Sequence, residues 1–483
     1  MLIVGIFFGG ALTVALLVFG LLLGRSGAEP AKRSESFVDS MCVGVHWDYN
    51  DTVYGQRYDE VRDKLAELGF RHVRSGGSST DVIDKMKELA ALGIKSTFVL
   101  DPSLGTKPDS TYWGNPPNYP IKDFVKDIND PSENGVGTDV IDAVEMHNEI
   151  DITYGDKRWY PDDSTPLSSD PDSSRYWVKY IRVATRDTHA ALESDPVTAG
   201  IPLYGPSLTS EQAYTIVGDL SASIDYSNVH WYLAGRHPET SGWGDNGYGS
   251  HPYHVYHLAR RQSPSDPVVA TEGGYSNAVN QNFTNTSEEV TARYLPRLFL
   301  HSFNGGFERF CAYELVDEWP NPEKDDNEKN FGLLRNDLSE KPAYVALKNL
   351  TDLLKDPGSS FTTGSLDYSL SGETTDVHRT LLHKRDGRFY VVLWVGKPSY
   401  DPTNGEPIEV PSQRVTLTLN QPIEKASTYL PNESASPTAH YDAPAHLTLD
   451  VPDHPLVVEL SPSSLPAQFL YELAEALDRL PWP

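Results

Sequence analysis

The sequence has few cysteines and few basic residues, and both shortages exclude classes of protein. Of its 483 residues only two, Cys42 and Cys311, are cysteines, and no CxxC or HExxH motif is present. A structural zinc site built from clustered cysteine and histidine is therefore excluded. Lysine and arginine number 40 against 68 aspartates and glutamates, which gives a net charge of −28. Because such a chain repels phosphate backbones, we expect no nucleic-acid partner.

Charge is absent altogether from residues 1–24. As a helix this segment is longer than the ~30 Å hydrocarbon core of a membrane, so we interpret it as a transmembrane anchor. Cleavage after Ala28, as in a secretory signal peptide, is the alternative. Basic residues follow the segment and none precedes it, which taken alone favours a cytoplasmic body. We nevertheless expect the protein on the extracellular face of the membrane, or secreted, with residues 25–40 as a polar tether.

The body of the chain divides into two regions by pattern. Over residues 41–356, extended apolar runs alternate eight times with amphipathic stretches, which predicts a closed (β/α)₈ TIM barrel in the α/β class. Residues 357–462 contain only short extended runs with turn residues between them, which predicts a β-sandwich. An amphipathic helix is expected in the tail, residues 463–483. The eight predicted barrel strands lie within residues 41–47, 72–77, 95–100, 140–149, 197–205, 227–233, 268–275 and 309–316.

Polar side chains end several of these strands, where TIM barrels carry their active sites. Glu149 ends the fourth strand and Glu272 ends the seventh, so the two carboxylates face each other across the barrel mouth. Retaining cleavage of a glycosidic bond needs two carboxyl groups about 5–5.5 Å apart, one as acid/base and one as nucleophile. A pair on the fourth and seventh strands can span such a gap.

Four motifs carry a resemblance to a known family. The clan A glycoside hydrolases carry similar residues at their strand ends. In this sequence the matching residues are, in the same order along the chain, Arg74, HNEI (147–150), HWY (230–232) and ATEGGY (270–275). The block FGLLRNDLSEKPAYVAL (331–347) also resembles the run from the eighth strand of that clan into its helix. The resemblance covers residues 41–460. It implies a retaining barrel glycosidase of oligosaccharides or polysaccharides with a C-terminal β domain and no cofactor.

The same resemblance implies roles for individual residues. Glu149 is the expected general acid/base, and Glu272 is the expected nucleophile, held ionised by hydrogen bonds from Arg74 and Tyr232. Asn148 is expected to bind the sugar 2-hydroxyl. The sequence departs from the family where Ala312-Tyr313-Glu314 ends the eighth strand, because many members carry a tryptophan there. Further contacts to the carbohydrate are expected from His230, His46, Trp47, Tyr313, Glu314 and Trp319.

Other interpretations remain open at this stage. Glu145 competes with Glu149 for the acid role, and Arg74 has an alternative role as the structural partner of a barrel carboxylate. The acidic loop over residues 317–330 is a weak calcium candidate without EF-hand spacing. The chain can also be a surface-anchored carbohydrate-binding protein that lacks catalysis. A metal-dependent barrel hydrolase is a further class, with His46, His147 and His230 as its ligands.

The two cysteines fall on the first and eighth predicted strands. These strands become neighbours when a barrel closes, so Cys42 and Cys311 can form a disulfide outside a reducing cytosol. Two buried thiols are the alternative.

Overall fold

The computed structural model describes residues 27–100, 121–130, 140–153, 159–160, 163–166, 168–173, 176–279 and 285–463. The apolar segment 1–24 and the tail after residue 463 lie outside these residues. Within the described part of the chain, no helix combines the length and the apolar character needed to cross a membrane.

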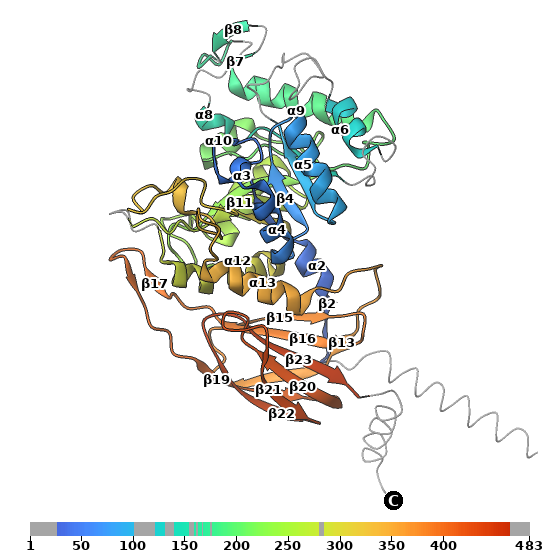
Figure 1. The fold of residues 1–483 in the computed structure, drawn as a ribbon, viewed down its shortest axis with the longest axis vertical. Coiled ribbons are helices and arrows are strands. Elements are labelled where there is room, and N and C mark those ends of the chain that lie inside the picture. Colours follow the sequence, from blue (N-terminus) through green and yellow to red (C-terminus); the bar gives the residue numbers. More distant parts are fainter. Residues whose placement is uncertain are drawn as a thin grey trace, which may run out of the picture.

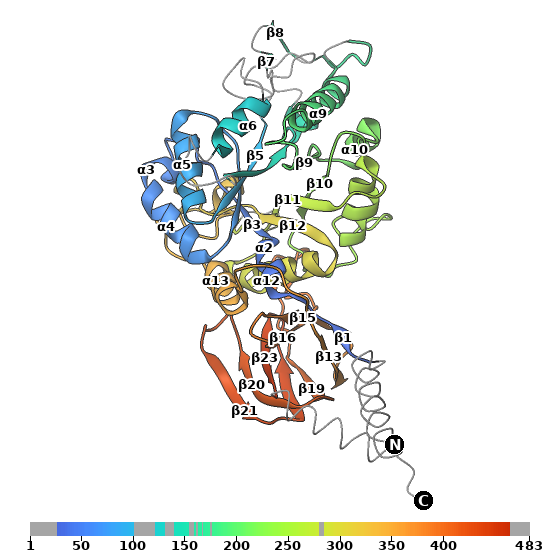
Figure 2. The ribbon, with the colours of Figure 1, turned by 90° about the vertical axis from the view of Figure 1, so that its right-hand side faces the viewer.

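Eight parallel strands form one sheet in the order β10-β11-β12-β3-β4-β5-β6-β9. A parallel bridge between Tyr204 and Tyr226 joins its two outer strands, so the sheet closes into the expected barrel (Figures 1 and 2). In chain order the strands are β3 (Met41–Gly44), β4 (His72–Ser75), β5 (Lys95–Val99), β6 (Ile141–Glu145), β9 (Leu203–Tyr204), β10 (Ser227–Tyr232), β11 (Val268–Gly274) and β12 (Phe307–Ala312).

Helices follow the strands, and their amphipathic spacing explains how they pack. In α4 (Tyr58–Leu68) the apolar residues Val61, Leu65 and Leu68 share one face and are buried, and Gly69 ends the helix at φ 80°. Glycine suits this left-handed position because it has no Cβ. The other helices around the barrel are α5 (Thr80–Ala91), α6 (Ile121–Asn129), α9 (Trp177–Glu193), α10 (Glu211–Val217), the π-helical η2 (Tyr253–Ala259), α11 (Arg260–Gln262), α12 (Glu288–Asn304) and α13 (Pro342–Leu354).

Shorter elements lie before and between these units: α2 (Ser34–Asp39), α3 (Val53–Gln56), α8 (Ile150–Thr153), β7 (Trp159–Tyr160), β8 (Asp163–Pro166) and η3 (Glu328–Asn330). The fifth barrel strand is shorter than predicted, because only Leu203–Tyr204 of the expected run 197–205 is extended. Asp195 accepts a hydrogen bond from the Val197 amide at 2.9 Å and so fixes a turn where the strand was expected to begin.

Two packed sheets form the predicted β-sandwich, with strand orders β2-β15-β16-β23-β20-β21 and β14-β19-β22. In β19 (Gln413–Leu419), every second residue from Val415 to Leu419 is buried, as expected for one face against a core. The remaining strands are β13 (Ser365–Leu366), β14 (Tyr368–Gly372), β15 (Val377–His383), β16 (Phe389–Val395), β17 (Tyr400–Asp401), β18 (Glu406–Pro407), β20 (Ile423–Tyr429), β21 (Pro437–Asp442), β22 (His446–Val451) and β23 (Leu456–Pro462).

The segment 25–40, expected as a tether, is largely ordered structure in its described part. Its strands β1 (Glu29–Pro30) and β2 (Lys32–Arg33) pair with β13 and β15 of the sandwich, and α2 then leads into the barrel. The prediction of a tether rested on the polarity of the side chains, whereas these strands pair through their backbones. The sandwich is therefore built from chain segments that precede the barrel and segments that follow it in the sequence.

Buried polar contacts join the two regions where α12 and α13 face the sandwich (Figures 1 and 2). Arg297 of α12 is fully buried and donates hydrogen bonds to the carbonyls of Lys397 and Asp453, each at 3.1 Å. Glu239 pairs with Arg297 and accepts a hydrogen bond from the Trp394 indole at 2.6 Å. The ion pair between a barrel loop and a barrel helix is thus also hydrogen-bonded to a sandwich strand.

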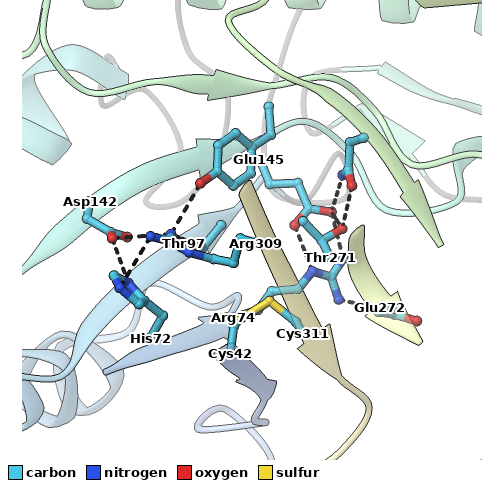
Figure 3. The surroundings of a disulfide bond; sticks show 12 residues. Cys42, His72, Arg74, Thr97, Asp142, Glu145, Thr271, Glu272, Arg309 and Cys311 are labelled. Carbon is cyan, nitrogen blue, oxygen red and sulfur yellow. Dashed lines mark hydrogen bonds and ion pairs between the residues drawn. A yellow bond between two sulfur atoms is a disulfide. The ribbon is translucent and has the colours of Figure 1, made fainter. Parts of the chain in front are cut away.

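The expected disulfide is present. Cys42 of β3 and Cys311 of β12 are direct partners across neighbouring strands, and their sulfurs are bonded (Figure 3). The bond links residues 269 positions apart and joins the first barrel strand to the eighth.

Candidate active site

A cavity of about 530 Å³ opens at the carboxyl ends of the barrel strands. Its wall combines acidic, aromatic and glycine residues from seven of the eight barrel strands and the segments that follow them. It is lined by Gly44, Val45, His46, Asp48, Tyr49, Arg74, Ser75, Gly76, Gly77, Val99, Leu100, Asn148, Glu149, Tyr232, Glu272, Tyr313, Glu328 and Phe331.

Arg74 is the centre of the polar network below this cavity (Figure 3). Its Nε and Nη2 donate to the two oxygens of Glu145 at 2.7 and 2.8 Å. Its Nη1 donates to Glu272 at 2.5 Å, and Nη2 also donates to Asn148 Oδ1 at 2.7 Å. Burial alone lowers the pKa of Arg74, but the charges of Glu145 and Glu272 outweigh burial and raise it. One guanidinium therefore orients three of the side chains around it.

Glu145 lies beneath the cavity and does not line it. The side chain is fully buried, and Asn228 and Thr271 also donate hydrogen bonds to its Oε1, at 3.1 and 3.0 Å. Its two oxygens face Arg74, so the structure places Glu145 as the buried partner of that guanidinium. Arg74 is thus the structural partner of the buried Glu145 and at the same time a donor to Glu272.

Glu272 sits at the end of β11 and is held by donors on both oxygens. Tyr232 donates its hydroxyl to Oε2 at 2.9 Å, and Arg74 donates to Oε1. Burial alone raises the pKa of Glu272, but the charges of His230 and Arg74, with the hydrogen bonds from Tyr232 and Arg74, bring it below the ordinary value. The side chain is therefore an ionised carboxylate at neutral pH.

His230 bridges the two strand-end glutamates. Its Nδ1 lies 2.8 Å from Glu149 Oε1 and 3.4 Å from Glu272 Oε2, and one oxygen of each glutamate lies within 4.8 Å of the other. Because Nδ1 faces two acceptors, it is the protonated nitrogen of the ring. Burial lowers the pKa of His230, but the charge of Glu272 and the hydrogen bond to Glu149 raise it overall. The residue supports the carboxylates from the side and does not line the cavity.

Local backbone geometry aims Glu149 at the cavity. Its φ is 42°, which is unusual for a residue with a side chain, and its amide donates to the Ser207 carbonyl at 3.0 Å. The chain therefore turns sharply directly after β6, between Asn148 and α8.

Besides His230, three other predicted sugar contacts are not in the cavity wall. Trp47 is fully buried, with its ring against those of Tyr54 and Tyr58, so it is a core residue and its predicted role is wrong. Glu314 is fully buried as well and accepts a hydrogen bond from Tyr54 at 3.1 Å. Trp319 lies next to the wall, with its ring centroid 6.1 Å from that of Tyr49.

The histidines proposed for a metal-dependent hydrolase do not converge. His147 is buried and its Nε2 lies 2.9 Å from the Tyr180 hydroxyl, while His230 contacts Glu149. Among the described residues, no cluster of metal-binding side chains contains His46, His147 and His230 together. These three histidines therefore do not form the metal site that a metal-dependent hydrolase would need.

His46 instead faces two other carboxylates. Its Nε2 lies 3.5 Å from Glu314 Oε2 and 3.5 Å from Glu318 Oε1. Burial lowers the pKa of His46 to about 4, although the charge of Glu272 opposes this shift. Burial and then the charge of Glu328 raise the pKa of Glu318 to about 7.

Some lining residues carried no usable signal in the sequence. Glu328 comes from the long loop after β12, where composition shows only an acidic stretch, and Phe331 begins the block that resembles clan A, which assigned it no role. Val99 and Leu100 end β5 as ordinary apolar residues. Their place in the wall depends on how the loops fold back over the barrel, which no local pattern specifies.

Comparison with known proteins supports the fold. No protein-family model and no curated protein matches this sequence. Among solved structures, a family 39 glycoside hydrolase from Bacteroides cellulosilyticus WH2 is 15% identical, with 90% of this chain and 83% of that chain covered and a TM-score of 0.50.

Two further structures are similar at the level of fold. A glucosidase from Croceicoccus marinus is 9% identical over 83% of this chain and 92% of that chain, with a TM-score of 0.53. CelM2, a bifunctional glucanase-xylanase from a metagenome library, is 10% identical over 91% of this chain and 98% of that chain, with a TM-score of 0.52. This chain therefore has the barrel and β domain of glycoside hydrolases, a fold that the resemblance to clan A fits.

Proposed function

We propose that this protein is a retaining glycoside hydrolase, with Glu272 as nucleophile and Glu149 as general acid/base. The observation that carries the proposal is the separation of the two glutamates, whose nearest oxygens lie within 4.8 Å at the cavity. Retaining enzymes place their carboxyl groups about 5–5.5 Å apart, whereas inverting enzymes need about 6.5–9.5 Å to admit a water. The spacing therefore favours double displacement.

In the first step Glu272 attacks the anomeric carbon. Its depressed pKa keeps it ionised, and Arg74 and Tyr232 hold both oxygens so that little reorganisation is needed. Glu149 donates a proton to the departing glycosidic oxygen, so the bond breaks without release of an alkoxide. The product is a glycosyl ester on Glu272.

In the second step water replaces the enzyme at the anomeric carbon. Glu149, now deprotonated, removes a proton from that water, and Glu272 leaves as a carboxylate. The N–H of His230 faces both glutamates and stabilises whichever of them carries the charge.

Neighbouring residues fit a carbohydrate as the substrate. Asn148 accepts a hydrogen bond from Arg74 through Oδ1, and its amide nitrogen is the group that we assign to the sugar 2-hydroxyl. Tyr49, Tyr313 and Phe331 supply aromatic surface in the cavity wall. His46 lies in the same wall and provides a polar edge.

The test compares the parent protein with Glu149→Gln and Glu272→Gln, using a chain that begins at residue 27 so that β1 and β2 are kept. Glu409→Gln, at an exposed site in the sandwich, is the matched control. Polysaccharides and aryl glycosides serve as substrates, and reducing ends are measured. We expect Glu272→Gln to lose all turnover. Glu149→Gln should lose about 10²–10⁴-fold on polysaccharides and less on aryl glycosides, whose leaving groups need little protonation.

The stereochemistry of the first product gives a second readout. A retained anomer in the proton NMR spectrum supports double displacement, and an inverted anomer contradicts it. Binding of a glycan without hydrolysis, unchanged by either glutamine, would favour a carbohydrate-binding protein.

An oxidising location forms part of the proposal. The disulfide between Cys42 and Cys311 supports a site of action outside a reducing cytosol. Together with the uncharged segment 1–24, it favours a protein that is exported and either anchored at the extracellular face of the membrane or secreted.

A further inference from the structure

A second group of buried carboxylates lies beside the proposed catalytic pair. His46 follows β3, and Glu314 and Glu318 lie on the loop after β12. Glu314 is fully buried and Glu318 is 4% exposed. One ring nitrogen and one oxygen from each carboxylate lie within 4.8 Å of one another.

Polar atoms in this group lack partners. Among the described residues, none makes a hydrogen bond with His46 Nε2, Glu314 Oε1 or Glu318 Oε1, and all three atoms are buried. Buried polar atoms without partners are rare in proteins, because each costs about 1–3 kcal/mol. Three such atoms in one place indicate that the group is completed by something other than these side chains.

The spacing and the donor types fit a metal ion. A tetrahedral zinc ion with ligands at about 2.1 Å places neighbouring ligand atoms about 3.4 Å apart. His46 Nε2 lies 3.5 Å from both Glu314 Oε2 and Glu318 Oε1. One imidazole nitrogen with two carboxylates suits zinc or manganese, whereas calcium and magnesium prefer oxygen ligands only.

We infer that His46, Glu314 and Glu318 bind one divalent transition-metal ion, with Zn²⁺ as the best fit. Contacts behind the ligands support this set. The Tyr54 hydroxyl donates to Glu314 Oε2 at 3.1 Å and accepts from the Val316 amide at 3.1 Å, which fixes the Glu314 carboxylate. The ring of His46 stacks on that of Tyr49 at 4.5 Å between centroids.

The ion has a structural consequence for the cavity. It ties the chain after β3 to the loop after β12, and both segments contribute to the cavity wall, through His46 and through Tyr313 and Glu328. The proposed catalytic carboxylates are not among its ligands. The site shares His46 with the cavity wall but no residue with the proposed catalytic pair, and it is tested without any substrate.

The test uses the full-length protein after treatment with a chelator. Isothermal titration with Zn²⁺, Mn²⁺, Ca²⁺ and Mg²⁺ measures stoichiometry and affinity, and thermal unfolding measures stabilisation. We expect one Zn²⁺ per chain, a rise in unfolding temperature of at least about 2 °C at saturation, and no response to Ca²⁺ or Mg²⁺.

Glu318→Gln and His46→Gln are the ligand variants, with circular dichroism to verify folding. Each should weaken zinc binding at least about tenfold, whereas Glu323→Gln, at an exposed position of the same loop, should bind as the parent does. Zinc anomalous diffraction should give a peak between the three side chains. Absence of binding in the parent, or equal affinity in the ligand variants and in Glu323→Gln, would overturn the inference whatever the protein hydrolyses.

Discussion

Replacement of Arg74 by methionine tests the network beneath the cavity. The Arg74 side chain is 8% exposed, and its guanidinium makes two hydrogen bonds to Glu145, one to Glu272 and one to Asn148. Methionine fills similar volume but leaves the fully buried Glu145 without a cation. Removal of one partner from a buried ion pair costs about 3–5 kcal/mol, since the remaining charge is uncompensated. We expect the free energy of unfolding of the barrel to fall by that amount.

A second substitution separates this charge effect from loss of packing. Glu145→Gln in the Arg74→Met background removes the stranded charge but keeps an oxygen to accept from Asn228 and Thr271. We expect the double variant to recover at least about 2 kcal/mol of the loss, a coupling typical of residues in direct contact. Catalysis should stay impaired, because Glu272 still lacks a donor on Oε1.

Urea unfolding followed by tryptophan fluorescence measures the four corners of this cycle, with reducing-end release as the activity readout. Arg57→Met is the control, because that arginine makes exposed contacts, an ion pair with Glu60 and a hydrogen bond to the Asp337 carbonyl, and such surface contacts contribute little to stability. An unchanged unfolding midpoint in Arg74→Met, or a further loss on adding Glu145→Gln, would refute this account of the network.

Three further outcomes are expected. Tyr232→Phe removes the hydroxyl bonded to Glu272, so turnover should fall about 10–100-fold. The pKa of Glu272 should also rise in this variant, so the acid limb of the pH–rate profile, where activity is lost as pH falls, should move to higher pH. An unmoved limb would contradict the role of Glu272 as the ionised nucleophile. The denatured parent should show no free thiol before reduction and two after it, and Cys42→Ser with Cys311→Ser should lower stability by at most about 5 kcal/mol, measured by urea unfolding. Glu239→Gln should lower the free energy of unfolding, measured by calorimetry, by about 3–5 kcal/mol, because the buried guanidinium of Arg297 loses its counter-charge. A variant as stable as the parent would contradict this expectation.

Elements with strong periodicity were predictable from the sequence. Alternation of apolar runs with helical faces gave the number and order of the barrel strands, because parallel strands buried on both sides need continuous apolar runs. The position of Glu272 near the end of its strand follows from the same pattern, whereas β6 ends at Glu145, four residues before Glu149. Cysteine placement on the first and eighth strands was likewise readable, since closure makes those strands neighbours.

Burial of particular side chains was not predictable in this way. Trp47 follows a strand and looks like a sugar platform, yet it packs against two tyrosines in the core. The polar run over residues 29–33 looks like a linker, yet its backbone completes two sheets. The partners of residues 29–33 lie far along the chain, so local composition carried no record of them. Tyr54 and Tyr58 are near Trp47 in sequence, but only the fold shows that their rings pack on it.

By itself the sequence determined the fold class, the order of the strands and the residue types at their ends, because these depend on periodicity along one chain. The tertiary structure alone decided which carboxylates stand together. It pairs Glu145 with Arg74 beneath the cavity, sets Glu149 and Glu272 across His230, and groups Glu314 and Glu318 on His46. Charges from different strands interact only at distances of a few ångströms, and barrel closure creates those distances.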